Sequence, residues 1–137
     1  MTIQPYLYFS GRADEAIDFY QKALGAGKQM LLRFNECPDP LPEGAIAPGW
    51  ESKVMHASLK IGESILLLSD GCGRDSPEFK GFALTFVTKA LDEADRVFAA
   101  LADGGRTRMP LGKTFFSPRF GTVEDRFGVL WNVIVLE

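Results

Sequence analysis

The stretch AIDFYQKALGAG at residues 16–27 and the stretch ADRVFAALADGG at residues 94–105 decide the fold, because one pattern occurs twice, 78 positions apart. In each, apolar residues recur at helical spacing and glycines follow the last of them, which is typical of a helix and its end. A short apolar run precedes each helix, and three strand-like runs follow it. The chain is therefore expected to be an α+β protein of two tandem βαβββ modules, with a ligand held between the halves.

Glycine- and proline-rich segments set the expected boundaries. A length of 137 residues fits one ordinary domain, so we expect a single domain with module one at 1–72, a linker at 71–80 and module two at 81–137. Residues 35–52 hold four prolines and two glycines, and a loop of this length is often a lid or a flexible insert. Trp50, near the end of that loop, is expected either to anchor it or to stack on a ligand.

The remaining runs predict the strands, helix caps and turns. Strands are expected at 3–9, 28–34, 53–61, 64–69, 81–87, 106–110, 114–124 and 129–136. The runs 64–69 and 129–136 are apolar on both faces, which indicates interior strands. Candidate N-caps are Ser10 for the first helix and Thr88 or Asp92 for the second. The expected buried stripes are Ala13, Ala16, Ile17, Tyr20 and Leu24, then Leu91, Ala94, Val97, Phe98 and Leu101.

Composition and charge argue against several classes of protein. The net charge is −3 and no run of Lys or Arg is present, which disfavours nucleic-acid binding through a basic patch. No apolar stretch approaches the roughly 20 residues that cross a bilayer, and the start lacks the pattern of a secretory signal. The two cysteines, Cys37 and Cys72, lie in separate loops. We therefore expect reduced thiols and a cytoplasmic location, with no membrane partner.

Six short motifs together resemble one known family. In chain order they are PYLYF at 5–9, AIDFY at 16–20, HASLKIG at 56–62, LSDG at 68–71, RFGTVED at 119–125 and FGVLW at 127–131. The set resembles the vicinal oxygen chelate superfamily, which includes glyoxalase I, bleomycin-resistance proteins, fosfomycin-resistance enzymes and extradiol dioxygenases. Within it, the chain is most similar to PhnB-like proteins, also labelled 3-demethylubiquinone-9 3-methyltransferase-like.

The resemblance carries expectations about shape and metal. It implies that each module curves its mixed sheet into half of a barrel-like central cleft, and that the protein is a homodimer. Metal-using relatives place four ligands in that cleft, and those positions correspond here to Pro5, Leu67, Phe82 and Asn132. Three of these side chains have no atom that can coordinate a metal. The resemblance therefore implies a member without the usual metal site and without a cofactor.

Candidate site residues come from the expected cleft strands. His56, the only histidine, is either a cleft-lining binding or acid/base residue or a hydrogen-bonded strand histidine. Arg119, on a broken strand, either binds an anionic ligand or is a surface charge. Ser69 either faces the cleft or closes the turn at Gly71. The other candidates for ligand binding are Trp50, Phe82, Phe86, Phe116 and Asn132.

Strand alternation gives an expected cleft face. Counted from Pro5 and Phe82, this face carries Leu7, Phe9, Leu84 and Phe86, while Trp131 faces the helices. An apolar, aromatic cleft is typical of a small-molecule site, although for any one of these rings packing in the core is the favoured alternative. Glu124 and Asp125 are adjacent and point to opposite faces, so they do not form an acid/base pair; Asp125 is expected to cap the turn before Gly128.

Two functions of different classes follow. The first is metal-free binding of a small, partly aromatic molecule between the modules. The alternative is a metal-dependent enzyme of the lyase, dioxygenase or transferase type, which would need a divalent metal on non-standard ligands such as His56, Ser69, Glu124 or Asn132. Methyl transfer is least favoured, because the chain lacks a glycine-rich strand-to-helix loop with a downstream acid.

Overall fold

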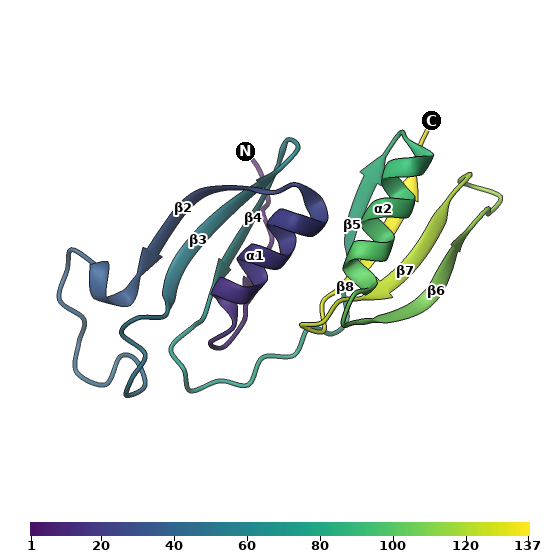
Figure 1. Cartoon of the computed structure of the whole chain (residues 1–137). Coiled ribbons are helices and arrows are strands. Elements are labelled where there is room, and N and C mark those ends of the chain that lie inside the picture. Colours follow the sequence, from purple (N-terminus) through teal and green to yellow (C-terminus); the bar gives the residue numbers. More distant parts are fainter. The chain divides into compact units, whose positions relative to one another are not determined.

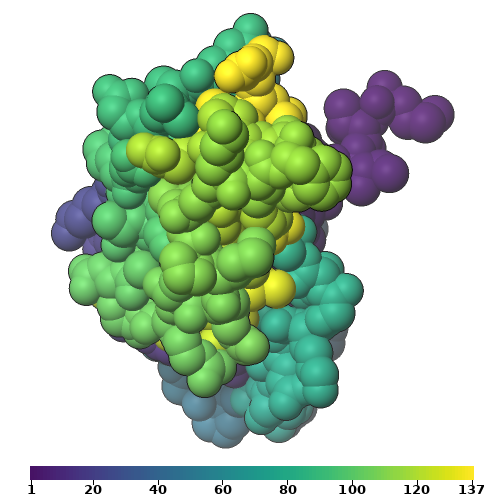
Figure 2. Space-filling view, turned by 90° about the vertical axis from the view of Figure 1, so that its right-hand side faces the viewer, coloured from purple at the N-terminus to yellow at the C-terminus, as the bar shows by residue number.

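A computed structural model describes all residues from Met1 to Glu137, and they divide into two compact units (Figure 1). Unit 1 spans Met1–Pro77 and unit 2 spans Glu78–Glu137, so the division falls inside the expected linker. Residues before the first strand project from the surface (Figure 2), and Met1 and Ile3 are fully exposed. Neither helix combines the length and the apolar character that crossing a membrane would require.

Unit 1 has the order strand, helix and three strands that the repeat predicts. Its elements are β1 (Tyr6–Tyr8), α1 (Ala13–Leu24), β2 (Gly27–Arg33), the short 3-10 helix η1 (Phe34–Glu36), β3 (Val54–Ile61) and β4 (Ser64–Ser69). The strands form one sheet in the order β1-β4-β3-β2. The pair β1–β4 is parallel and the other pairs are antiparallel. The sheet is therefore mixed, with β4 in its interior as expected.

Unit 2 repeats this topology. Its elements are β5 (Leu84–Thr88), α2 (Leu91–Ala102), β6 (Arg106–Gly112), β7 (Phe120–Glu124) and β8 (Leu130–Val135), and their sheet order is β5-β8-β7-β6. The expected interior position of the last strand is confirmed. In Figure 1 each helix lies across one face of its own sheet. The strands thus form two mixed four-stranded sheets, which confirms two βαβββ modules, and no closed barrel is formed.

The cores lie between each helix and its sheet. All five residues of the first predicted stripe are buried, and Phe19 and Ala23 join them. In α2 the buried residues are Ala94, Val97, Phe98 and Leu101. Leu91, the first residue of α2, was expected among them but is 45% exposed. Each large apolar side chain buried here stabilises the fold by about 1.5–3 kcal/mol.

Helix α1 begins differently from the prediction. Ser10 is not its cap: the residue has a φ of 49°, and the N-cap position is Arg12, which makes no capping hydrogen bond. Instead Asp70, which follows β4, accepts hydrogen bonds from the N–H groups of Gly11 and Ala13 at 2.7 and 2.8 Å. The unpaired N–H groups of a helix start need such an acceptor, and here it arrives from a distant part of the chain.

Helix α2 has no side-chain cap at all. Its N-cap is Ala90, so both expected caps are wrong. The Thr88 hydroxyl accepts from the Ala90 N–H at 3.2 Å, and the Asp92 carboxylate accepts from the Glu93 N–H at 3.0 Å. Both side chains therefore bond to N–H groups one or two residues further along the chain, and neither occupies the N-cap position.

Some strands begin or end at other residues than the sequence predicts. Regular pairing in β1 begins at Tyr6, since Pro5 has no N–H to contribute. The run expected at 114–124 is ordered as a strand only from Phe120, because Ser117 and Pro118 bend the chain before it. Strand β6 continues to Gly112 through two register shifts, where the sequence suggested an end at Pro110.

Candidate functional site

The face of the unit 1 sheet that α1 does not cover carries two tyrosines. Along β1, Tyr6 and Tyr8 are 36% and 49% exposed, whereas Leu7 between them is 4% exposed. The two tyrosine rings stack with centroids 5.0 Å apart and an interplanar angle of 27°. Because side chains alternate along a strand, this open face of unit 1 is aromatic at its β1 edge.

The cleft face expected from strand alternation is therefore wrong. Leu7 is buried, and the ring of Phe9 lies 6.2 Å from that of Tyr20 on α1. The count started at Pro5, which lies outside β1, so it did not fix the orientation of the strand.

The same correction applies to unit 2. Phe86 pairs with the buried Val133, and Val133 pairs with Gly121, so all three lie on one face of the sheet. This face is toward α2, because a Cβ at Gly121 would be 2.8 Å from the Phe98 ring of that helix. Phe86 and, by alternation, Leu84 thus lie on the face that the helix covers. Trp131 shares this face and is 4% exposed, which confirms its expected orientation.

His56 lies on β3, on the same open face as the two tyrosines. Its Nδ1 shares a hydrogen bond of 2.9 Å with the Tyr6 hydroxyl, which reaches over β4. Partial burial raises the pKa of the Tyr6 phenol above its ordinary value of 10.0; Tyr8 raises it further and the Ser69 hydroxyl lowers it. Tyr6 is therefore a neutral phenol around pH 7. We call Tyr6, Tyr8 and His56 the aromatic face.

Ser69 and Trp50 make structural contacts near this face. The buried Ser69 hydroxyl donates to the Val54 carbonyl and accepts from the Gly71 N–H at 2.9 Å, so it closes the turn at Gly71. The indole N–H of Trp50 donates to the Gly71 carbonyl at 2.8 Å, and Lys53 lies 5.8 Å above the indole ring. These contacts support the interpretation of Trp50 as the anchor of loop 35–52.

Asn132 is the centre of a polar row on the open face of unit 2. Its amide oxygen accepts from the Thr122 hydroxyl at 3.0 Å, and its amide N–H group donates to the Thr85 hydroxyl at 3.4 Å. The three residues are neighbours across β7, β8 and β5. Two residues further along each strand, on the same face, the side chains are apolar: Ile134 pairs with Phe120 on one side and with Val87 on the other. The structure thus places an amide and two hydroxyls beside an apolar row.

Two further aromatic candidates lie at the edges of unit 2. Phe82 precedes β5 and is 42% exposed. Phe116 lies in the connection between β6 and β7, where it makes edge-on contacts at 5.1 Å with Phe115 and Phe120. Neither ring belongs to the polar row of Thr85, Asn132 and Thr122.

Arg119 and Glu124 are both occupied by ion pairs. Arg119 donates from Nε and Nη2 to the Asp95 carboxylate at 3.0 and 3.2 Å, so the surface-charge alternative fits it better than an anion site. Glu124 accepts from Arg106 at 2.9 Å and from Arg108 at 3.4 Å. The Arg106 hydrogen bond holds the pKa of this carboxyl below its ordinary 4.5.

The positions that correspond to the family's metal ligands do not offer a matching donor set. Pro5, Leu67 and Phe82 have no side-chain donor atom, and the Asn132 oxygen is taken by Thr122. The chain gathers no three His, Cys, Asp or Glu side chains suited to one ion. A His and Glu ligand set of the usual kind therefore does not fit these residues; whether the protein works without a metal stays a prediction.

The sequence did not single out the aromatic face as a unit. The signal was present in the run Tyr6-Leu7-Tyr8, because tyrosines that alternate with leucine favour a strand with one wet and one buried face. The cross-strand contact from Tyr6 to His56 spans 50 positions and has no local signal.

Comparisons with known proteins agree with this architecture. A family model described as the Glyoxalase/Bleomycin resistance protein/Dioxygenase superfamily matches residues 2–133. Protein YjdN of Escherichia coli (strain K12) is 32% identical over 144 residues, covering 100% of this chain and 97% of the relative.

Two solved structures are similar over nearly the whole chain. Protein PA1353 from Pseudomonas aeruginosa shares 38% identity with a TM-score of 0.86, covering 98% of this chain and 97% of that one. The PhnB protein from Bacillus cereus, a proposed 3-demethylubiquinone-9 3-methyltransferase, shares 27% identity with a TM-score of 0.78, covering 99% and 100%. By its repeated βαβββ units and by these matches, the chain belongs to the Glyoxalase/Bleomycin resistance protein/Dioxygenase superfamily, with PhnB-like neighbours.

Proposed function

We propose that this protein binds a small, partly aromatic organic molecule without a metal, and that the aromatic face of unit 1 is a contact surface for it. The observation that carries the proposal is the stacked, half-exposed pair of Tyr6 and Tyr8 beside His56. A contiguous patch of exposed rings, unlike a single exposed ring, is typical of a surface that contacts a ligand or partner. Rings of this kind favour flat ligands, which they contact face to face or edge to face.

The hydrogen-bonding groups on this face are fixed before a ligand arrives. Tyr6 and His56 hold each other through their hydrogen bond at 2.9 Å, so less rotamer freedom remains to be lost on binding. The neutral Tyr6 phenol and the second nitrogen of the His56 ring remain suited to a ligand hydroxyl or carbonyl. A ligand that combines a ring with such an oxygen would match both features.

The metal-dependent alternative receives no support from the donor atoms. Of its four suggested ligands, Ser69, Glu124 and Asn132 are held in hydrogen bonds or ion pairs within the protein, and His56 shares its Nδ1 with Tyr6. Methyl transfer, which the name of the Bacillus cereus neighbour suggests, is not favoured either. The connection from β1 to α1 contains one glycine, Gly11, and lacks the glycine-rich pattern of a nucleotide-like cofactor site.

The test uses 2-naphthol, a neutral bicyclic phenol, as a probe in excess EDTA. Saturation-transfer NMR should detect binding to the wild-type protein. The double variant Tyr6→Ala/Tyr8→Ala should weaken it about fivefold or more, since each aromatic contact is worth about 1 kcal/mol.

Phe115→Ala is the matched control, because Phe115 is a fully exposed ring in unit 2. It should leave the affinity for 2-naphthol unchanged. Amide NMR spectra check that the wild type and the double variant are both folded. If the two then bind 2-naphthol with equal affinity, the assignment of the aromatic face is overturned. Binding that appears only after a divalent metal is added would favour the enzyme alternative.

A further inference from the structure

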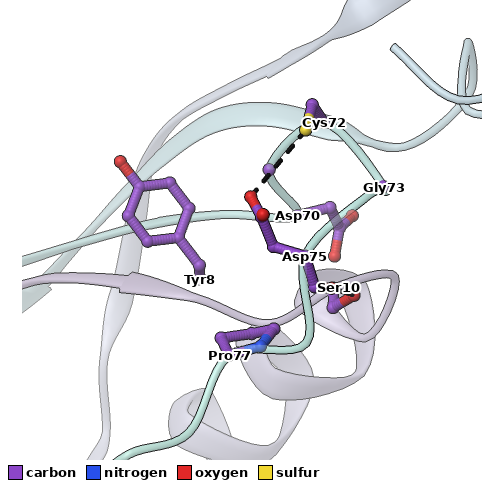
Figure 3. Close-up of a pocket in the computed structure, with 8 residues that line it drawn as sticks. Tyr8, Ser10, Asp70, Cys72, Gly73, Asp75 and Pro77 are labelled. Carbon is purple, nitrogen blue, oxygen red and sulfur yellow. Dashed lines mark hydrogen bonds between the residues drawn. The ribbon is translucent and has the colours of Figure 1, made fainter.

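A small cavity of ≈ 290 Å³ opens in unit 1 where β1 and β4 end. Figure 3 shows Tyr8 on one side of it, with Asp75, Cys72 and Pro77 around the other. Ser10 closes part of the wall, and its hydroxyl donates to the Asp75 carbonyl at 3.2 Å. Such a volume is at the lower end of small-molecule pockets.

The walls of this cavity are held from behind. Asp70 fixes the start of the 70–77 segment, because its Oδ1 accepts from Gly11 and Ala13 and its Oδ2 accepts from the Val54 N–H at 2.9 Å. Both carboxylate oxygens of Asp70 are therefore used by the backbone, and this residue supports the pocket without being available to a ligand.

Loop 35–52 holds the next part of the wall. The Ala47 N–H donates to the Cys72 carbonyl at 2.8 Å, and Trp50 donates to the Gly71 carbonyl at 2.8 Å. Gly73 lies so close to this loop that a Cβ there would be 2.8 Å from the Ala47 Cβ and from the indole of Trp50. The cavity is thus pre-organised, which lowers the entropy lost on binding.

Asp75 gives the cavity an unbalanced negative charge. Its carboxylate is contacted by the Cys72 thiol at 3.9 Å, and a thiol is a weak donor. Asp75 has no ion pair, and no Lys or Arg lines the cavity. The neighbouring Arg74 points elsewhere, since its guanidinium donates to the carbonyls of Gly44 and Ile46.

A carboxylate facing an aromatic ring is suited to one class of ligand. Ammonium groups are attracted both to a carboxylate and to the face of a tyrosine, while Tyr8 and Pro77 provide apolar surface for the attached carbon skeleton. We propose that this cavity binds a monovalent organic ammonium ion that carries an apolar group, with Asp75 as its counter-ion and Tyr8 as its aromatic wall. The proposal does not depend on the proposed function, because only Tyr8 is common to the two surfaces.

The test uses benzylammonium as the probe, with benzyl alcohol and benzoate as its neutral and anionic analogues. Amide chemical-shift titration of the full chain should place benzylammonium at Tyr8, Ser10 and the 71–75 segment. Benzyl alcohol should bind about tenfold more weakly and benzoate not measurably. Asp75→Asn should weaken benzylammonium about threefold or more and leave 2-naphthol unaffected; Tyr8→Leu should weaken benzylammonium about fivefold.

Asp39→Asn is the matched control, because it removes the same charge from an exposed loop position outside the cavity. It should leave benzylammonium binding unchanged. Equal affinity for benzylammonium and benzyl alcohol, shifts that map outside the cavity, or an equal effect of Asp39→Asn and Asp75→Asn would each overturn the proposal. Loss of 2-naphthol binding alone would contradict the proposed function and leave this site standing.

Discussion

The two units share one topology but place a buried aspartate at different ends of equivalent strands. In unit 1, Asp70 follows β4 and ties the start of α1 to the start of β3. In unit 2, Asp125 precedes β8: it accepts from the N–H groups of Phe127 and Val129 and from the indole of Trp131. The repeat therefore duplicates the backbone path and not the groups that brace it.

The open faces differ in the same way. Unit 1 presents Tyr6, Tyr8 and His56, whereas unit 2 presents the hydrogen-bonded row of Thr85, Asn132 and Thr122. The buried faces can stay alike because any apolar residue of suitable volume fills them. The open faces differ in kind: one is aromatic, and the other is a hydrogen-bonded polar row beside apolar side chains.

The largest expected effect comes from removing either buried aspartate. Asp70→Ala and Asp125→Ala each remove the acceptor of three N–H groups, two of them in buried hydrogen bonds. Each should lower the free energy of unfolding by about 3 kcal/mol. Hydrogen-exchange mass spectrometry should show faster exchange confined to the unit that carries the change. Asp18→Ala, at an exposed position of α1, should change little; equal loss of protection in both units would show that they are not braced separately.

Loop 35–52 has no counterpart of similar length in unit 2, and Gly73 tests its docking. Gly73 has a φ of 87° and no room for a Cβ, whereas Gly62 has a φ of 58° and open space around it. Both alanine variants carry the backbone strain of about 1 kcal/mol; only Gly73→Ala adds the clash with Trp50. We expect Gly73→Ala to cost about 1–2 kcal/mol more, measured by urea unfolding. Equal costs would mean that the loop is not held there.

Giving α2 the side-chain cap that it lacks should make the units more alike. Ala90 occupies the N-cap position with an extended backbone, so Ala90→Ser should stabilise the helix start by about 1 kcal/mol. Ala99→Ser, at an exposed interior position of α2, should instead be slightly destabilising. Thermal unfolding measures both, and a cap effect of the opposite sign would show that Asp92 already serves the helix start.

The smallest effect concerns one helix aspartate in each unit, which pairs with an arginine at a different place in each repeat. Arg33 holds the pKa of Asp14, and Arg119 that of Asp95, below the ordinary 3.8. The small stability contribution of each pair is complete above that value and is lost as the pH falls through the lowered pKa. Carboxyl-carbon NMR should find both residues titrating below 3.8, and Arg33→Gln should raise the pKa of Asp14 alone. A change at Asp95 in that variant would contradict the pairing.

Much of the fold could be predicted from the sequence because its signals are local. Helical spacing at 16–27 and 94–105, glycine at Gly25, and the turn residues at Asp125 and Gly128 act within a few positions. The cap of α1 could not be predicted in this way, because its acceptor Asp70 lies 57 positions from Ala13 in the sequence. A side chain's own propensity for a cap, as at Ser10, gives no hint of a stronger acceptor that arrives through the fold.

The candidate site was harder to predict for a related reason. Strand alternation gives two faces but does not say which one a helix will cover, and the count from Pro5 chose the wrong one. His56 was identified as the only histidine, and Asn132 because it corresponds to a metal-ligand position of the relatives. Their partners Tyr6 and Thr122 come from other strands. Arg119 was identified as well, and its partner Asp95 lies 24 positions away.

Calorimetric titration of tag-free, EDTA-treated protein with Zn²⁺, Ni²⁺, Co²⁺ and Mn²⁺, followed by 2-naphthol, tests the claim of metal-free binding most directly. The account predicts no metal site tighter than about 1 μM (about −8 kcal/mol) and the same 2-naphthol affinity with or without metal. Stoichiometric metal binding below about 1 μM, with 2-naphthol bound only by the loaded protein, would contradict it.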